Sequence, residues 1–439
     1  MLIRPRLHLP STLLAGLAIL VAACGGSTTP TASPSATAAP TSAPASASPA
    51  ASAPTTSSSP AAGGDEDAIY DAIEAQVLEI RGLDAVDVDR ETIDGAELKA
   101  MNEADFDKDN PPEYVAANER LYKALGLMPE SDSLRSLFLE LVDSQVAGFY
   151  QPDAKKLYVV SRSGAINGAD KITFAHEYDH ALQDANFPGV FAEQKDLLDQ
   201  SDQALARAVV YEGDATILMS YWALPNLTPA EIQEVIAAGS DPASNEILAR
   251  TPAILRESLL FPYDAGVAFL TPIQTSEGWA GVDAVFADLP RSTEQVLHPE
   301  KYQAKEEPVA VTLPSDLAAD LGDGWSVALE DTFGEFQMRT WLRETGVPDP
   351  GATDAAAGWG GDRLAVLDGP GDSWGVVMKT AWDTEADAEA FEAAAATATG
   401  AAGGPGGVFV GEGGLTRWVV IGSDDATSET LANVLGLAG

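Results

Sequence analysis

The chain is poor in cysteine and in basic residues, and each shortage excludes something. Cys24 is the only cysteine among 439 residues. No disulfide can therefore form within one chain, and the core must be stabilised by burial. Only 25 lysine and arginine side chains accompany 67 acidic ones, which gives a formal net charge of -42. A surface of this kind repels nucleic acid and anionic lipid headgroups, so we expect no nucleic-acid partner.

The first 24 residues have the pattern of an export signal. Arg4 and Arg6 precede an apolar run over 13–21, which is too short to span a bilayer. Val-Ala-Ala-Cys at 21–24 resembles the bacterial lipobox, in which the cysteine is acylated and becomes the mature N-terminus. We therefore predict a signal peptide over 1–24, lipidation at Cys24 and an extracytoplasmic protein lipid-anchored to the cell membrane. The alternative is a plain signal peptide with an incidental cysteine.

Composition divides the remaining chain into a tether and two folded parts. Residues 25–64 are almost wholly Ser, Thr, Ala, Pro and Gly, with no charged or aromatic residue. They cannot form a core and are predicted to be a disordered tether. A stretch rich in Gly, Pro, Ala and Asp at 346–361 indicates a second boundary. We predict one domain over 65–350 and a smaller domain over 355–439.

Hydrophobic periodicity predicts an α+β protein. The first domain is expected to be mainly helical with a small sheet: helices at 111–125 and 133–142, two strands around a turn within 147–160, and mostly helices from 170 to about 288. A capping box at Thr228–Glu231 predicts the start of one of these helices. The smaller domain is expected in the order ββαββα, with strands at 363–367, 373–380, 408–411 and 416–421 and helices at 385–398 and 428–435.

Two of the four histidines lie in the segment His176-Glu177-Tyr178-Asp179-His180, which has the form HExxH. Positions i and i+4 share one helical face, so both imidazoles can reach one zinc ion. Glu177 lies about 100° round the helix, where it can take a proton from a metal-bound water. We expect Asp170 to cap the start of this helix and 186–189 to end it. The alternative is a chance match on an ordinary helix.

Catalytic zinc usually takes three protein ligands, so a third is needed. Glu212 lies in an apolar stripe over 205–219, where a carboxylate is costly to bury unless a cation meets it. We predict Glu212 as the third ligand; otherwise it pairs with a residue such as Arg207 or reaches solvent. Gly213 costs about 1 kcal/mol in a helix interior relative to alanine, which indicates that another backbone or a ligand approaches closely.

Two further acids are candidates for orienting a ligand histidine. Asp184 and Asp214 could each accept the second N–H of a ligand imidazole, as carboxylates near metal sites often do. The alternative for each is an ordinary solvated acid.

The HExxH helix, followed by Tyr-Glu-Gly-Asp-Ala at 211–215, resembles the gluzincin class of zinc metallopeptidases. The wider sequence, roughly 65–344, resembles bacterial lipoproteins of metallopeptidase type; the matching stretches are 147–150, 176–184, 212–214 and 290–302. The resemblance implies a zincin-like fold, in which the strand at 156–161 would offer an edge to an extended peptide. The chain departs from thermolysin-like members at Thr216, where they carry an acid, and in its longer gap between His180 and Glu212.

The sequence thus predicts zinc-dependent hydrolysis of a peptide or protein substrate at the outer face of a bacterial membrane. Zn²⁺ bound by the two histidines and Glu212 would activate water. Glu177 would be the general base and later the proton donor to the leaving amine. His298 is nominated as the donor to the oxyanion, with Tyr211, Tyr263 and Tyr302 as rivals. The alternative for His298 is a helix-capping or surface histidine.

Other functions compete with this prediction. The main rival is a non-catalytic surface lipoprotein, an adhesin or binding module with a structural metal. Amide cleavage on a non-peptide substrate is a further alternative, because HExxH specifies activated water and not the substrate. Manganese or cobalt could replace zinc, although imidazoles with one carboxylate suit zinc.

Overall fold

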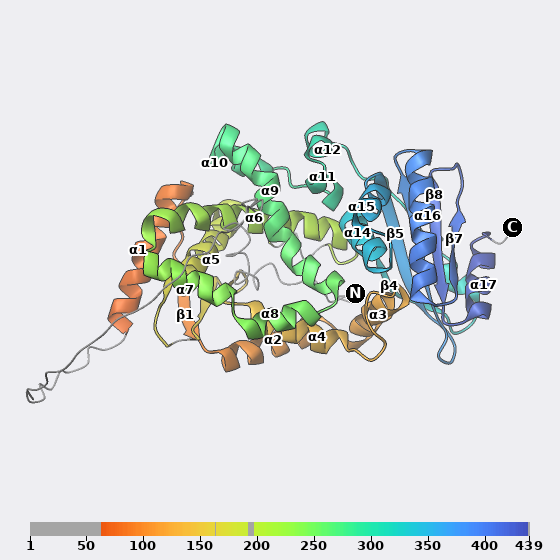
Figure 1. Ribbon diagram of the computed structural model, residues 1–439, viewed down its shortest axis with the longest axis horizontal. Coiled ribbons are helices and arrows are strands. Elements are labelled where there is room, and N and C mark those ends of the chain that lie inside the picture. Colours follow the sequence, from red (N-terminus) through yellow and green to blue (C-terminus); the bar gives the residue numbers. More distant parts are fainter. Residues whose placement is uncertain (1–62, 163, 192–196, 438–439) are drawn as a thin grey trace, which may run out of the picture.

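The computed structural model describes residues 63–437, apart from 163 and 192–196. The predicted signal peptide, Cys24 and nearly all of the predicted tether lie outside the described residues. A helical body is joined to a five-stranded sheet, which makes the protein α+β as predicted (Figure 1). Within the described ranges, no helix combines the length and the hydropathy that crossing a membrane requires.

A small sheet lies at one side of the helical body. It contains β1 (Asp89–Ile93), β2 (Gly148–Gln151) and β3 (Lys156–Val160) in the order β1-β3-β2. The antiparallel β2–β3 hairpin is the predicted pair of strands, whereas β1, which runs parallel to β3, was not predicted. β3 lies between the other two strands. The expectation that it offers a free edge is therefore wrong, and the edges belong to β1 and β2.

Four helices form the centre of the helical body. They are α1 (Gly63–Arg81), α5 (Gly168–Asn186), α6 (Ser201–Asn226) and α9 (Ala253–Glu277). The HExxH segment lies on α5, as expected. The N-cap of this helix is Asn167 and not Asp170, because Asn167 has the extended backbone of a cap and accepts hydrogen bonds from the next turn. Asp170 closes the capping box by accepting from the Asn167 amide.

The helices α6 and α9 cross in close backbone contact. A Cβ atom on Gly213 of α6 would lie 2.6 Å from Cα of Gly266 on α9. The expectation that another backbone approaches Gly213 is confirmed. Because Gly213 follows Glu212 directly, this crossing also sets how α9 lies against the predicted metal ligand.

Shorter helices surround this centre. They are α2 (Gly95–Asp109), α3 (Pro112–Ala124), α4 (Leu134–Gln145), α7 (Pro229–Gly239), α8 (Pro242–Arg250), α10 (Trp279–Phe286), α11 (Thr293–Leu297) and α12 (Pro299–Ala304). A further short helix, α13 (Leu317–Leu321), packs against the C-terminal sheet. The predicted helices at 111–125 and 133–142 correspond to α3 and α4. The predicted capping box at Thr228–Glu231 starts α7.

The C-terminal unit, which we define as residues 326–434, contains an antiparallel sheet in the order β4-β5-β6-β8-β7. Its elements are β4 (Ser326–Asp331), α14 (Gly334–Glu344), α15 (Asp349–Ala356), β5 (Trp359–Asp368), β6 (Trp374–Trp382), α16 (Glu385–Ala402), β7 (Gly406–Val410), β8 (Thr416–Gly422) and α17 (Asp425–Val434). The predicted ββαββα order is present from β5 to α17. The sheet begins earlier than the predicted boundary at 355, because β4 pairs with β5.

The C-terminal unit packs directly on the helical body. Its helix α14 contacts α6 and α9 on one side and α16 on the other, and α3 contacts β4 and β5. Trp341 of α14 is fully buried, and its indole N–H donates to the carbonyl of Leu125 after α3. Buried side chains of both parts therefore belong to one hydrophobic cluster. Figure 1 shows the two parts side by side.

Candidate metal centre

Three side chains from two helices converge inside the helical body. His176 and His180 lie one turn apart on α5, and Glu212 projects from α6. The Nε2 atom of His176 is 3.1 Å from Oε2 of Glu212, and Nε2 of His180 is 3.4 Å from the same oxygen. The two Nε2 atoms are 3.0 Å apart. The structure thus brings together all three predicted ligands, none of them more than 2% exposed.

These distances fit a tetrahedral metal ion. Ligand atoms about 2.0–2.1 Å from a tetrahedral zinc lie roughly 3.3 Å from each other. The observed separations of 3.0, 3.1 and 3.4 Å are close to that value. The three donor atoms face one another, and a three-residue set leaves one position of a tetrahedron free.

A hydrogen bond determines which nitrogen of His180 faces Glu212. Gln183 donates its amide N–H groups to the carbonyl of Tyr211 and to Asp179, both at 3.0 Å, so its Oε1 atom is left as an acceptor. Nδ1 of His180 lies 2.9 Å from that oxygen and therefore carries the ring proton. In the neutral ring, Nε2 then presents a lone pair toward the Glu212 carboxylate. Two facing lone pairs repel each other unless a cation or a proton lies between them.

Glu177 lies in the same interior with a free carboxylate. It is fully buried, and neither of its oxygens makes a hydrogen bond of normal geometry among the described residues, although the backbone N–H of Tyr150 comes close enough to lower its pKa. Burial raises the pKa of Glu177 to about 8, against the opposing effect of His180. Such a group is costly to bury unless a ligand meets it.

The charges of the three ligand residues depend on each other. Burial favours the neutral form of Glu212, but His180 and then His176 bring its pKa down to about 2. Burial alone would lower the pKa of His180, but Glu212 raises it to about 10. The pKa of His176 stays lowered by burial. Glu212 is therefore the anionic member of the group, as a cation-binding site requires.

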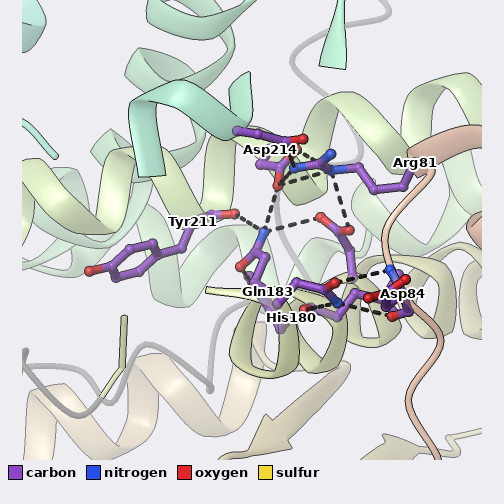
Figure 2. Close-up of polar contacts among 10 residues, drawn as sticks. Arg81, Asp84, His180, Gln183, Tyr211 and Asp214 are labelled. Atoms are coloured by element: carbon purple, nitrogen blue, oxygen red, sulfur yellow. Dashed lines mark hydrogen bonds and ion pairs between the residues drawn. The ribbon is translucent and has the colours of Figure 1, made fainter. Parts of the chain in front are cut away.

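Behind His180 lies a buried polar network (Figure 2). Gln183 donates to Asp214 at 3.2 Å, and Asp214 receives the Arg81 guanidinium at 3.1 Å. Arg81 comes from the end of α1 and also pairs with Asp283 at 2.6 Å. Burial alone would lower the pKa of Arg81. The charges of three nearby acids, Asp214, Asp179 and Asp283 in order of effect, raise it instead. The arginine thus remains charged in the interior.

This network corrects the prediction for the two orienting acids. Asp214 reaches His180 only through Gln183, which occupies the place expected for a carboxylate. Asp184 does not meet a ligand histidine at all: it accepts from the Tyr150 hydroxyl at 2.8 Å and from Lys155 on the β2–β3 hairpin. The signal for Gln183 was its position three residues after His180, on the same helical face.

The structure does not bring His298 to the centre. Its Nε2 atom lies 2.9 Å from Oε1 of Glu335 on α14, and that carboxylate raises the pKa of His298. Among the described residues, its ring nitrogens face Glu335 and, at 3.8 Å, Glu300, and not the three predicted ligands. The nomination of His298 as oxyanion donor is therefore corrected: α14 holds it in a pair of its own.

One of the rival tyrosines does lie at the centre. The Tyr263 ring from α9 stacks on His176 with centroids 6.1 Å apart. Burial, followed by the charges of Glu212 and Glu177, raises the pKa of the Tyr263 hydroxyl. The other two rivals are engaged elsewhere: Tyr211 donates to the Val190 carbonyl and Tyr302 to that of Asp288.

A second cluster of acids is already neutralised. Glu294, Glu306 and Asp383 converge, but Nζ of Lys301 lies 2.6, 2.9 and 2.5 Å from their carboxylates. The lysine supplies the positive charge there, so this cluster needs no metal ion.

Comparison with known proteins finds a match for the C-terminal unit alone. Residues 326–431 match the family model described as Domain of unknown function (DUF8575). No curated protein and no solved structure matches the chain. The helices that carry the metal centre lie before the matched residues. The C-terminal unit is therefore similar to a domain of unknown function, and it is packed against a helical body whose site must be interpreted from its own geometry.

Proposed function

We propose that the protein is a zinc-dependent peptidase, with its metal bound by His176, His180 and Glu212. The observation that carries this proposal is the convergence of three donor atoms beside the unpartnered carboxylate of Glu177. Three ligands instead of four are the pattern of a catalytic zinc site, because a structural zinc is usually closed by a fourth protein ligand. The HExxH resemblance supports the same reaction class.

The residues around the centre can perform hydrolysis. When bound, zinc would lower the pKa of a water molecule and polarise the scissile carbonyl. Glu177 takes the proton from that water as its oxygen bonds to the carbonyl carbon, and passes the proton to the amine nitrogen as the C–N bond breaks. Tyr263 is placed to donate its hydroxyl proton in a hydrogen bond to the oxyanion. Gln183 holds His180 in the tautomer that leaves Nε2 free.

The edge strand β2 supports a peptide as the substrate. A Cβ atom on Gly148 in this strand would lie 3.5 Å from Cγ of Glu177. An extended peptide that adds to the edge of a sheet gains main-chain hydrogen bonds that do not depend on its sequence. A peptide along β2 would therefore pass the proposed base. We propose that the reaction takes place outside the cytoplasmic membrane, with the protein lipid-anchored through Cys24.

A non-catalytic protein with a structural metal is the second candidate, and one observation favours it. All three predicted ligand residues are buried, whereas a catalytic metal has to be reached by its substrate. The two candidates differ in what they require of Glu177, because a structural site has no use for an unpartnered acid beside the metal.

Replacement of Glu177 by glutamine separates these functions. The wild type and the Glu177→Gln variant are compared for zinc content by elemental analysis and for cleavage of denatured casein. We expect equal zinc content and a loss of cleavage of about 10²- to 10⁴-fold, the usual contribution of a general base. Glu246→Gln, which makes the same change at an exposed acid on α8, serves as the control and keeps activity. Unchanged turnover in Glu177→Gln would refute the assigned base.

A further inference from the structure

An apolar groove leads from Glu212 along one face of α6. Ser201, Ala204, Leu205, Ala208 and Glu212 all line it, and their spacing of three and four residues puts them on the same side of the helix. At 1.5 Å per residue, the face from Ser201 to Glu212 is roughly 16 Å long. The groove thus runs from Glu212, the one predicted ligand that lines it, to the start of α6.

The opposite wall belongs to α9 and to the helices α3 and α4. Ile254, Leu255, Ser258 and Pro262 line it from α9, and Pro262 directly precedes Tyr263. The hydroxyl of Ser258 is buried and has no hydrogen-bond partner among the described residues. An unpartnered polar group in an apolar wall indicates a place where a ligand supplies the missing hydrogen bond. A peptide group is a suitable partner.

The C-terminal unit closes the far end of the groove. Asp331, Thr332 and Phe333 follow from β4 toward α14, Gln337 lies on α14, and Leu364 on β5. These residues all fall within the stretch that matches the domain of unknown function. The groove therefore needs both the metal-bearing helices and the C-terminal unit for its walls.

The free space indicates which side chain fits. The groove holds about 100 Å³. An apolar cavity of about 150 Å³ is large enough for benzene, so this smaller space admits one small apolar side chain and nothing larger. Leu121, Leu141, Ile254 and Leu364 would surround it with apolar contacts.

We propose that this groove binds an aliphatic side chain of the peptide substrate, and that the C-terminal unit is part of the substrate-binding site. The inference rests on the proposed peptidase function, because that function supplies a peptide chain at Glu212. It gives the domain of unknown function a role as one wall of a specificity pocket.

The test measures binding separately from cleavage. The probes are a blocked heptapeptide of alanine and glutamine with one central leucine, and the same peptide with alanine in its place. Their affinities for the zinc-loaded, full-length Glu177→Gln protein are measured by calorimetry. Burial of the leucine side chain should make its peptide bind roughly 10- to 100-fold more tightly. Equal affinity for the two peptides would overturn the proposal.

Three variants locate the bound side chain. Ala208→Leu fills the groove beside Glu212, and Gln337→Trp fills it from the C-terminal unit; both should reduce the preference for leucine to less than about 3-fold. Ala237→Leu is the control: it adds a leucine on the exposed surface of α7, away from the groove, and should leave the preference for the leucine peptide unchanged. Zinc content and circular dichroism check that each variant is folded. If both groove variants still prefer the leucine peptide, the proposal is contradicted. If only Ala208→Leu loses the preference, the C-terminal unit is not part of the binding site.

Failure of this inference is distinguishable from failure of the proposed function. If the wild type cleaves casein but shows no leucine preference, the groove assignment is wrong and the peptidase stands. If the leucine preference holds but the wild type cleaves nothing, the peptidase proposal is wrong and the groove is a peptide-binding site.

Discussion

The glycine contact between α6 and α9 gives a prediction that joins packing to the metal centre. A Cβ atom on Gly266 would lie 2.5 Å from Cα of Gly213 and 2.5 Å from the carbonyl oxygen of Val209. Carbon atoms in contact normally lie about 3.5–4.0 Å apart. Gly266→Ala must therefore push the helices apart by roughly 1 Å, since both obstacles are backbone atoms.

The cost can be estimated from this displacement. Overpacking in a well-packed core typically costs about 1–3 kcal/mol. Alanine regains up to about 1 kcal/mol in a helix interior relative to glycine, which only partly offsets the cost. We expect Gly266→Ala to lower the free energy of unfolding by about 1–2 kcal/mol. Glu212 and Tyr263 lie on the two separated helices, and a shift of about 1 Å at a reacting site can cost roughly 100-fold in rate.

The assay combines denaturant unfolding with zinc competition against a chelator. Gly400→Ala is the matched control, because a Cβ atom at this helical glycine of α16 meets nothing within 4 Å. We expect the control to be unchanged or slightly more stable, with wild-type zinc affinity. If Gly266→Ala were as stable as the wild type and bound zinc equally well, the close crossing would not be what holds Glu212 in place.

Two further predictions concern buried charges. Arg81→Met leaves Asp214 and Asp179 buried without their cation, and it should lower the free energy of unfolding by about 3–5 kcal/mol in denaturant. The control Arg135→Met removes an exposed pair with Asp107 and should cost less than about 1 kcal/mol. Equal costs for the two variants would contradict the inferred network. Burial raises the pKa of Asp331 from 3.8 to about 6, so its folded form holds a proton more tightly and its stabilising contribution is lost as pH rises from about 4 to 6. Asp331→Asn cannot titrate, so its stability relative to wild type should rise by up to about 3 kcal/mol between pH 4 and pH 7; a difference that does not change with pH would refute the raised pKa.

The parts of the site that could be predicted from the sequence are those with a local signal. The spacing of His176 and His180 defines a helical face, and Glu212 stands out as a carboxylate within an apolar stripe. Gly213 gave a third local signal, since its cost in a helix has to be offset by a close neighbour. The hairpin β2–β3 and the order of elements from β5 to α17 were predictable for the same reason.

The parts that could not be predicted depend on contacts distant in sequence. Arg81 meets Asp214 across 133 positions, and nothing near either residue indicates the other. Tyr263, and not His298, lies beside His176 because of the way α9 crosses α6. β1 is a mostly polar segment, Asp89–Ile93, which becomes a strand by pairing with β3. β4 was missed because two helices separate it from its partner β5.

The pairing of β4 with β5 decides where the chain can be cut into fragments that fold. The stretch 346–361 has the composition of a linker, and protease cleavage near 357 would appear to release a separate module. Such a cut would leave β4 on the first fragment and β5 on the second, although the two strands pair from Ser326 to Asp331. Each fragment alone would expose unpaired backbone groups. We therefore expect the cleaved halves to stay together as a nicked complex, and either half expressed by itself to aggregate.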